Sequence, residues 1–330
     1  MIELIYIEKE IRKHPRTEEI LSRFPKAKVL SCNHYKEIFN PSAQSFRLQK
    51  KKPALILARQ HGKLIHPIPP SYGVGGAQNY YFSHLLNCLY DCRYCFLQGM
   101  YPSAHYLLFL NYEDFAEEIV HASRKHPGEE SWFFSGYDCD SLALESVTGF
   151  AKHFLPLFRD LPHSWLELRT KSVAIRELMK TEVLGNVVVA FSFTPEEISE
   201  QIEHGVPPVS SRIEAMKKLA RKGWKLGLRI DPLIDCKDFE SRYRRLFQSI
   251  FDALQSGSIH SVSLGSFRMP SGFFKKIEKQ HPSEPLLAAN WESRKGMISY
   301  PQETESALRD ICKNLLLEHV PRQRLFQCET

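Results

Sequence analysis

The spacing of apolar residues changes along the chain and separates predicted strands from predicted helices. From residue 79 onward, short and nearly continuous apolar runs alternate with longer segments whose apolar residues recur every three or four positions. The first pattern is typical of parallel strands covered on both faces, and the second of amphipathic helices. The predicted strands are Tyr80–Leu86, Trp132–Phe134, Trp165–Leu168, Val187–Phe193, Leu226–Ile230 and Ser261–Leu264. The predicted helices are Tyr112–Ser123, Leu142–Phe158, Val173–Met179, Ser211–Arg221, Phe239–Leu254 and Phe273–Lys279.

Six strand–helix units in succession predict an α/β protein built on a partial parallel (β/α)6 barrel. We place this barrel domain at residues 77–280, between an N-terminal α/β layer at 1–76 and a C-terminal extension at 281–330. In such a barrel the chemistry gathers at the carboxyl ends of the strands, in the loops that precede the helices. Candidate functional residues are therefore sought in those loops.

The two flanking segments have weaker patterns. In the N-terminal layer we expect a strand at Ile2–Ile7, a helix at Thr17–Phe24 and a strand at Ala54–Ala58, with the basic stretch Phe46–Lys52 as a connector. The Pro- and Gly-rich stretch Pro67–Ala77 predicts an irregular link, and its glycines depart from the spacing of a phosphate-binding loop. In the C-terminal extension we expect a strand at Lys295–Tyr300 and a helix around Glu305–Leu317.

Composition agrees with a globular protein that has a large core. The 330 residues are 43% hydrophobic and 25% charged, which excludes a disordered or collagen-like chain. No apolar run is long enough for a membrane helix, and the acidic start MIELIYIEKE is unlike a signal peptide. We therefore expect a cytoplasmic protein without a membrane partner. The net charge of +6 is compatible with a polyanionic partner but lies below that of a dedicated nucleic-acid arm.

Three of the eight cysteines form a cluster. Cys88, Cys92 and Cys95 have CxxxCxxC spacing directly after the first predicted barrel strand. Three thiolates on one loop can bind three corners of an iron–sulfur cluster and leave the fourth iron open for another ligand. A Cys3His zinc site with His84 and a metal-free set of thiols are the alternatives, although no second cysteine pair of the usual zinc type is present. The other five cysteines are expected to be small buried hydrophobes.

The spacing of these cysteines, with Tyr94 directly before the third, resembles the signature of the radical S-adenosylmethionine superfamily. The resemblance implies a [4Fe–4S] cluster on Cys88, Cys92 and Cys95 whose open iron binds S-adenosyl-L-methionine (AdoMet). Reductive cleavage of AdoMet would then give methionine and a 5′-deoxyadenosyl radical, which abstracts hydrogen from a substrate. The (β/α)6 pattern agrees with the barrel of this superfamily.

A narrower resemblance extends over nearly the whole chain and is to the spore photoproduct lyase family. It implies that Lys171 and Ser192 contact the carboxylate end of AdoMet, and that Tyr94 takes part in AdoMet contact and hydrogen transfer. Taken alone, these residue types favour a simpler interpretation, with Lys171 as a solvated lysine and Ser192 as a strand-end serine. The stretches that carry the resemblance are CLYDCRYCFLQ at 88–98, DSLALE at 140–145, Thr170–Lys171, FSF at 191–193, KLGLRIDP at 225–232 and Lys295–Gly296.

The chain departs from the family pattern at two positions. The family has a Cys-Thr-Ser-Asp run whose cysteine donates hydrogen to the product radical, and alignment on Asp140 puts Tyr137 at the cysteine position. Cys139 lies two residues later. The second family tyrosine, after the third cysteine, is Phe96, which has no hydroxyl hydrogen. Either Tyr137 and Cys139 take over the hydrogen-donating step or the chain acts on another substrate, and a buried Cys139 is equally compatible with a structural role.

The resemblance implies a radical lyase for DNA repair, which breaks a carbon–carbon bond of a thymine photodimer in DNA. Its partners would be DNA and an external electron donor of the flavodoxin or ferredoxin type. The alternatives are a radical AdoMet enzyme for another nucleic acid or a small molecule, and a zinc-stabilised nucleic-acid-binding protein without catalysis. Phosphate contacts would need basic side chains near the barrel mouth. The candidates are Lys50–Lys52, Arg242, Arg244, Arg245, Arg268, Lys275 and Lys276.

Overall fold

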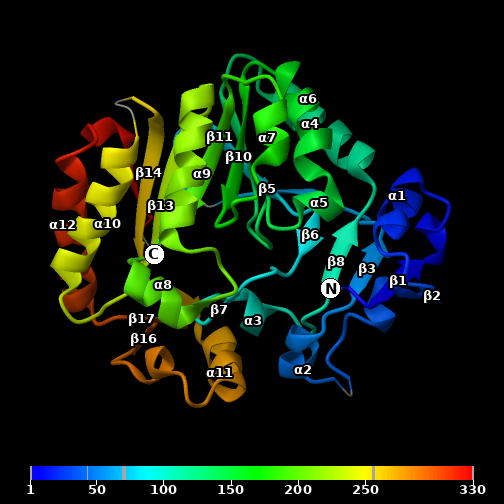
Figure 1. Ribbon diagram of the computed structural model, residues 1–330, viewed down its shortest axis with the longest axis horizontal. Helices are drawn as coiled ribbons and strands as arrows, with labels where there is room; N and C mark the ends of the chain where they lie inside the picture. Colours follow the sequence, from blue (N-terminus) through cyan, green and yellow to red (C-terminus); the bar gives the residue numbers. More distant parts are fainter. Residues whose placement is uncertain (1, 43, 69–71, 255–256, 329–330) are drawn as a thin grey trace.

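The structure is a computed structural model that describes residues 2–42, 44–68, 72–254 and 257–328. Its centre is a curved sheet in which six parallel strands are neighbours in chain order (Figure 1). All five pairings between these six strands are parallel, which confirms the predicted partial (β/α)6 barrel. The strands are β5 (Gln78–Phe82), β9 (Ser131–Ser135), β10 (Ser164–Thr170), β11 (Val187–Ser192), β13 (Lys225–Leu233) and β14 (Ile259–Ser266).

Two short strands extend the barrel sheet at its edges. β18 (Leu325–Gln327) pairs parallel to β14, and β4 (Ile65–Pro67) pairs antiparallel to β5. The predicted strand Tyr80–Leu86 is divided between β5 and β6 (Leu85–Leu86), and β6 belongs to a different sheet. The chain therefore leaves the barrel sheet directly before the cysteine cluster.

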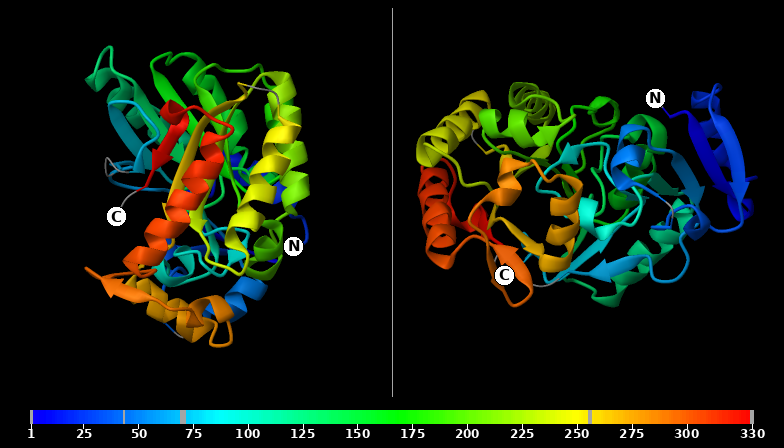
Figure 2. Two further views of the ribbon diagram at one scale, coloured as in Figure 1. Left: turned by 90° about the vertical axis from the view of Figure 1, so that its left-hand side faces the viewer. Right: turned by 90° about the horizontal axis from the view of Figure 1, so that it is seen from below.

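Helices cover the outer face of the barrel sheet (Figures 1 and 2). They are α4 (Tyr112–Lys125), α6 (Phe150–Arg159), α7 (Arg176–Lys180), α9 (Val209–Lys222), α10 (Phe239–Ala253) and α12 (Gln302–Leu317). The short helices α5 (Glu145–Thr148) and α8 (Glu196–Ile202) lie lower in Figure 1, beside β6 and β7 (Asp91–Cys92) respectively. One predicted helix, Leu142–Phe158, is two helices, because Gly149 adopts a left-handed conformation (φ 59°) that ends α5. Their apolar faces and the sheet enclose the main hydrophobic core.

The N-terminal layer is a second sheet with the strand order β2-β1-β3-β8-β6. Its strands besides β6 are β1 (Leu4–Glu8), β2 (Lys28–Cys32), β3 (Leu55–Ala58) and β8 (Tyr106–Phe109), with α1 (Pro15–Arg23) packed beside them. The sheet thus combines the N-terminal segment with strands from both sides of the cysteine cluster. This arrangement fixes the two ends of the cysteine-bearing segment to one rigid sheet.

The basic stretch Phe46–Lys52 is not a connector, and that prediction is wrong. It forms helix α2 (Phe46–Lys51), in which the Ser45 side chain accepts from Leu48 N. The Gln49 side chain accepts from Ser103 Oγ and Ala104 N, so a tertiary contact holds a helix whose sequence alone is not amphipathic. The link predicted over Pro67–Ala77 includes 69–71, which lie outside the described residues.

The first part of the C-terminal extension, up to β17 (Met297–Ser299), lies with the preceding β15 (Arg268–Pro270) and α11 (Ser271–Gln280) at the carboxyl ends of the barrel strands, at the bottom of Figure 1. This part holds 3-10 helix η4 (Pro285–Ala288) and the strands β16 (Glu292–Arg294) and β17, and β17 pairs antiparallel to both β16 and β15. Helix α11 precedes η4 and packs against α3 (Leu97–Met100). The predicted strand at Lys295–Tyr300 and the predicted helix at Glu305–Leu317 are β17 and α12.

Among the described residues, no helix is both long and apolar enough to span a membrane. The barrel interior carries one fully buried ion pair in its sheet, between Glu167 Oε2 on β10 and Arg229 Nη2 on β13, at 2.5 Å. Arg229 also donates to Ser261 on β14. These contacts tie β10 to β13 and β14 across the intervening strand β11, and they are separate from the site described next.

Candidate active site

The cysteine loop (residues 87–96) runs between β6 and α3 and contains the short strand β7 (Asp91–Cys92). Lys50 of α2 donates to the carbonyl oxygens of Cys88 (2.7 Å) and Tyr90 (2.8 Å). Gln98 donates to the carbonyl of Cys92 at 2.6 Å. The loop is therefore held by side chains that bind its backbone, which leaves its three thiols free to bind other groups.

The three thiols lie in a buried group, where each would repel the others if ionised. Cys92 is buried, and Cys88 and Cys95 are half-buried. Burial raises the pKa of Cys88 to about 12 and the pKa of Cys92 well above its ordinary value, and the neighbouring thiols raise both further. Thiolates at these positions need a compensating cation, which a bound metal would supply, because metal coordination deprotonates a thiol.

The donor set is three cysteines on one loop, which is compatible with a multi-iron cluster. Within the described ranges, no three His, Cys, Asp or Glu side chains converge closely enough to hold one ion. A cubane spreads its three cysteine ligands over three iron atoms, so the thiols need not converge on one point. The three cysteines on one loop therefore suit an iron–sulfur cluster, whereas a tetrahedral zinc site needs its ligands around one centre.

His84 does not complete a zinc site. Its ring stacks on Phe150 with a centroid distance of 3.9 Å and lies edge-on to Tyr112. Complete burial lowers the pKa of His84 to about 3, so the ring is neutral. His84 is thus part of the aromatic core, and the zinc alternative loses its fourth ligand.

Lys171 and Ser192 lie at the carboxyl ends of neighbouring barrel strands, as the sequence predicts. Ser192 is the last residue of β11, and Lys171 directly follows β10. Asp140, in the loop after β9, accepts from Thr170 Oγ1 (2.7 Å) and from the backbone N–H of Lys171 (2.6 Å). The loop that carries Asp140 and the end of β10 are therefore joined, because the Asp140 carboxylate fixes the backbone of Lys171.

Two of the three residues predicted to contact AdoMet, Tyr94 and Lys171, lie against a carboxylate that the sequence analysis did not identify. Glu203, at the start of β12 (Glu203–His204), is fully buried. It accepts a hydrogen bond from the Tyr94 hydroxyl, and its Oε1 lies 3.8 Å from Lys171 Nζ. Burial opposes the charge of both partners, yet their attraction lowers the pKa of Glu203 and raises that of Lys171, so both are ionised.

Arg212 completes this network and was also missed. Its guanidinium is fully buried, lies 3.1 Å from Glu203 Oε2 and donates to the carbonyl oxygen of Ser192 at 2.9 Å. A sequence signal existed, since Arg212 occupies an apolar-face position of α9. A charged residue on the buried face of a helix requires a buried partner. Glu203 belongs to a strand of only two residues, so no periodic pattern in the sequence indicates that its side chain is buried.

Tyr137 and Phe96 are in contact at the barrel mouth. Their ring centroids are 5.6 Å apart, and the ring of Tyr81 on β5 also lies against Tyr137, tilted by 34° at a centroid distance of 4.6 Å. The Tyr137 residue is 46% exposed. Gly136, with φ 82°, makes the turn after β9 that brings Tyr137 to this position. The two positions at which the chain departs from the family pattern are thus neighbours in space.

Cys139, unlike Tyr137, packs into the core. It is 6% exposed and belongs to the apolar cluster beneath the N-terminal sheet, together with Leu85 and Leu108. Burial raises its pKa well above the ordinary value, with a further contribution from Cys88. Cys139 therefore packs in the core as a neutral thiol, close to the cysteine loop but on its inner side. Of the remaining cysteines, Cys32, Cys312 and Cys328 are buried and Cys236 is half-buried.

Most of the basic residues proposed for phosphate contact are already paired. Arg268 binds Asp231 at 3.0 Å, and Arg245 binds Glu197 at 2.8 Å. Arg242 and Arg244 have carboxylate partners as well. Lys275 and Lys276, by contrast, are exposed on α11. Since α11 packs against α3 at the end of the cysteine loop, these two lysines are the better phosphate candidates.

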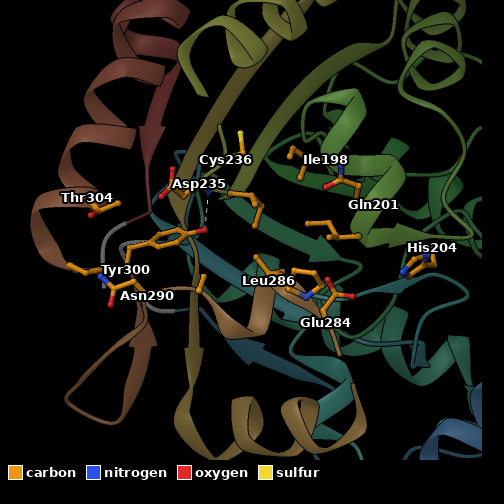
Figure 3. A pocket seen from close by; sticks show the side chains of 15 residues that line it. Ile198, Gln201, His204, Asp235, Cys236, Glu284, Leu286, Asn290, Tyr300 and Thr304 are labelled. Carbon is orange, nitrogen blue, oxygen red and sulfur yellow. Dashed lines mark hydrogen bonds between the residues drawn. The ribbon is translucent and has the colours of Figure 1, made fainter. Parts of the chain in front are cut away.

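A cavity of about 620 Å³ opens beside the cysteine loop (Figure 3). His204, whose strand β12 pairs with β7, lies at one side, and Asp235 and Tyr300 lie at the other. The backbone N–H of Asp235 donates to the Tyr300 hydroxyl at 2.9 Å. The volume is typical of a small-molecule pocket, but its wall includes none of the predicted site residues. Glu203 is on the same strand as His204 and faces away from this cavity.

Comparisons with known proteins agree on one family. A family model described as spore photoproduct lyase matches residues 1–326. The spore photoproduct lyase of Bacillus subtilis (strain 168) is 22% identical over 338 residues, which cover 98% of this chain and 97% of the relative. The enzyme of the same name from Geobacillus sp. (strain Y412MC61) is 22% identical over 292 residues, covering 86% and 83%.

Solved structures of spore photoproduct lyase share the fold over the full length. A variant with bound AdoMet and dinucleoside spore photoproduct superposes with a TM-score of 0.85 at 19% identity, covering all of this chain and 98% of that one. A complex with dinucleoside spore photoproduct alone gives a TM-score of 0.85 at 18% identity, with the same coverage. At this identity the likeness concerns the fold.

Proposed function

Because the chain belongs to the spore photoproduct lyase family, we propose that it is a radical AdoMet lyase that splits a thymine photodimer of the spore photoproduct type in DNA. The observation that carries this proposal is the convergence at one end of the barrel. The cysteine loop, Lys171 after β10 and Ser192 at the end of β11 are linked there by the Glu203–Arg212 network. The residues proposed as cluster ligands therefore lie at the same end of the barrel as the residues proposed to bind the amino-acid part of AdoMet.

Cys88, Cys92 and Cys95 would hold a [4Fe–4S] cluster, and Lys171, Ser192 and Tyr94 would hold AdoMet beside it. When bound, the two cofactors supply a 5′-deoxyadenosyl radical that abstracts hydrogen from the lesion. Lys171 offers its ammonium to the AdoMet carboxylate, and Ser192 offers its hydroxyl. Tyr94 Oη donates to Glu203, so the Tyr94 ring is fixed against the Lys171 ammonium, whose Nζ lies 5.4 Å from the ring centroid.

Tyr137 would return the hydrogen atom to the product radical. The family cysteine position is Tyr137 and the second family tyrosine position is Phe96, and the two rings are in contact. This contact therefore still has one hydroxyl hydrogen, but it belongs to Tyr137 and not to the residue at position 96. Cys139 is a weaker candidate because its thiol packs among apolar side chains on the inner side of the loop.

The proposed partners are DNA and an external electron donor of the flavodoxin or ferredoxin type. The proposed location is the cytoplasm. Lys275 and Lys276 on α11 are suited to phosphate contact because they are exposed beside the end of the cysteine loop. A lesion would have to leave the base stack to reach the barrel, at a cost of a few kcal/mol that damage itself reduces.

The test uses anaerobically purified protein with reductant, AdoMet and dinucleoside spore photoproduct. We expect iron and sulfide in amounts that fit one [4Fe–4S] cluster, formation of 5′-deoxyadenosine and recovery of the undamaged dinucleoside. A colourless protein that contains zinc and no iron would overturn the proposal and leave a zinc-stabilised nucleic-acid-binding protein.

A second candidate function is a radical AdoMet enzyme for another nucleic acid or a small molecule. Tyr137 and Phe96 favour it, since both departures from the family pattern lie where the family handles the product radical. In the same assay, formation of 5′-deoxyadenosine with the lesion left intact would select this alternative over photodimer repair.

A further inference from the structure

Glu203 is linked to every residue predicted to contact AdoMet, although these residues come from three separate elements. It binds the Tyr94 hydroxyl of the cysteine loop directly, and its Oε1 is 3.8 Å from Lys171 Nζ. Its link to Ser192 passes through Arg212, which donates to the carbonyl oxygen of Ser192. One carboxylate thus relates the positions of all three.

The backbone of Glu203 is joined to the cysteine loop. β12 pairs with β7 in a register that sets Glu203 opposite Cys92. One residue earlier, the carbonyl of Ile202 accepts from Arg93 N at 2.8 Å. Side chains on successive strand residues point to opposite faces, so Glu203 points into the network while His204 lines the neighbouring cavity. Glu203 therefore moves with the loop that carries the cluster ligands.

The two cations around Glu203 are held differently. Arg212 is fully buried and donates to Ser192 O, Ser199 Oγ and Glu203. Lys171 is 15% exposed, and its Nζ makes no hydrogen bond to any described residue. The ammonium is held by attraction to Glu203 and to the face of the Tyr94 ring, and neither contact is a hydrogen bond, so its three N–H donors are free for a ligand.

The charge balance of the network suits one incoming carboxylate. Arg212 and Lys171 are two cations, and Glu203 is one anion, so a single positive charge is left over in a buried setting. Without Glu203, two uncompensated cations would repel each other there. With it, the surplus charge is concentrated on Lys171, the cation whose donors are free.

We propose that Glu203 is a positioning residue for AdoMet: it sets Lys171 and Tyr94 in place so that the Lys171 ammonium receives the AdoMet carboxylate. This inference rests on the function proposed above, because it takes AdoMet as the ligand. Glu203 itself does not touch the reacting atoms. Its role is to hold the ammonium close to the cysteine loop without occupying the donors of that ammonium.

The test compares AdoMet binding in the anaerobic, cluster-loaded native protein and in Glu203→Gln. The readouts are iron content, the change that AdoMet causes in the electron paramagnetic resonance signal of the reduced cluster, and the Kd for AdoMet. We expect full iron content, an altered signal and AdoMet binding weakened by roughly tenfold or more. Native affinity in Glu203→Gln would overturn the proposal.

The matched control is Glu167→Gln, which removes the other fully buried carboxylate that pairs with an arginine in the same barrel. Its AdoMet affinity should equal that of the native protein even if its stability falls. An equal loss of affinity in both variants would show a general effect of barrel stability and would overturn the specific role of Glu203.

A second variant covers the case in which Glu203→Gln fails to hold its cluster. Glu203→Asp keeps the charge but shortens its reach to Lys171 and Tyr94, so AdoMet affinity should fall while iron is retained. Native affinity in this variant would contradict the proposal. Repair activity is not a readout here, so a native protein that binds AdoMet but leaves the lesion intact overturns only the substrate assignment.

Discussion

The rings of Tyr137 and Phe96 touch at the mouth of the barrel, with their centroids 5.6 Å apart, although the residues belong to different loops. Phe96 follows the third cysteine of the cysteine loop, and Tyr137 follows β9. Both positions were singled out from the sequence as departures from the family pattern, and the structure brings them together. The pair keeps a single hydroxyl, on Tyr137.

Removing the Tyr137 hydroxyl should uncouple radical formation from product formation. We expect Tyr137→Phe to form 5′-deoxyadenosine as the native protein does, because Tyr137 is not among the proposed AdoMet contacts. Recovery of undamaged dinucleoside should fall at least roughly tenfold, which corresponds to about 1.4 kcal/mol in the barrier. Chromatographic quantification of both products measures the ratio. Cys139→Ser serves as the comparison, and a larger loss in that variant would move the hydrogen donor to Cys139.

Loss of one cluster cysteine should abolish the iron centre. Cys92→Ala is expected to contain almost no iron or sulfide and to form no 5′-deoxyadenosine, because two thiolates cannot hold the cluster. Metal analysis and the visible absorption of the anaerobic protein measure this. Cys312→Ala, which removes a buried cysteine on α12, should keep its iron. Retention of the cluster in Cys92→Ala would contradict the ligand assignment.

The exposed lysines of α11 should contribute to DNA affinity through phosphate contacts. The double variant Lys275→Ala/Lys276→Ala is expected to bind a DNA duplex more weakly. The slope of log affinity against log salt concentration should become shallower, by an amount that corresponds to the loss of up to about two phosphate contacts. Fluorescence anisotropy over a series of salt concentrations measures both quantities. The control removes two exposed cations from α9, Lys218→Ala/Arg221→Ala, and should leave the salt dependence unchanged. Equal effects in the two double variants would count against an α11 interface.

Glu145 should make the protein less stable as the pH rises. Burial raises the pKa of Glu145 to about 7, against hydrogen bonds from the backbone N–H of Ala151 and Lys152. A carboxyl whose pKa is higher in the folded state binds more protons there, so its contribution to stability is complete below about pH 4.5 and is lost as the pH rises through 7. We expect Glu145→Gln to raise Tm relative to the native protein by a few degrees at pH 8 and by less at pH 5. A pH-independent difference in Tm, measured calorimetrically, would rule this out.

Much of the fold follows from local sequence patterns, and the exceptions have physical reasons. The six barrel strands and their helices are where the apolar spacing predicts them, because burial on one or both faces of an element imposes that spacing. Helix α2 was missed because tertiary contacts such as those of Gln49 stabilise it. The break at Gly149 was missed because a single left-handed residue leaves the apolar spacing nearly intact.

The candidate site divides in the same way. Cys88, Cys92 and Cys95 could be grouped from the sequence because they lie on one loop, and Lys171 and Ser192 could be placed at strand ends. Glu203 could not, because it reaches Tyr94 across 109 residues of sequence. The same holds for Arg268, whose charge suggests a phosphate contact but whose partner Asp231 lies 37 residues away.

The sequence by itself therefore determined the (β/α)6 architecture and the cysteine loop. It also determined that the candidate site lies at the carboxyl ends of the barrel strands. Each of these depends on periodicity or spacing within a short segment, which backbone geometry sets directly. Only the tertiary structure decided that Glu203 joins the predicted cofactor residues, that Tyr137 meets Phe96 and that Cys139 faces the core. Those relationships depend on strand register and on side-chain direction across elements distant in the chain, which no local pattern encodes.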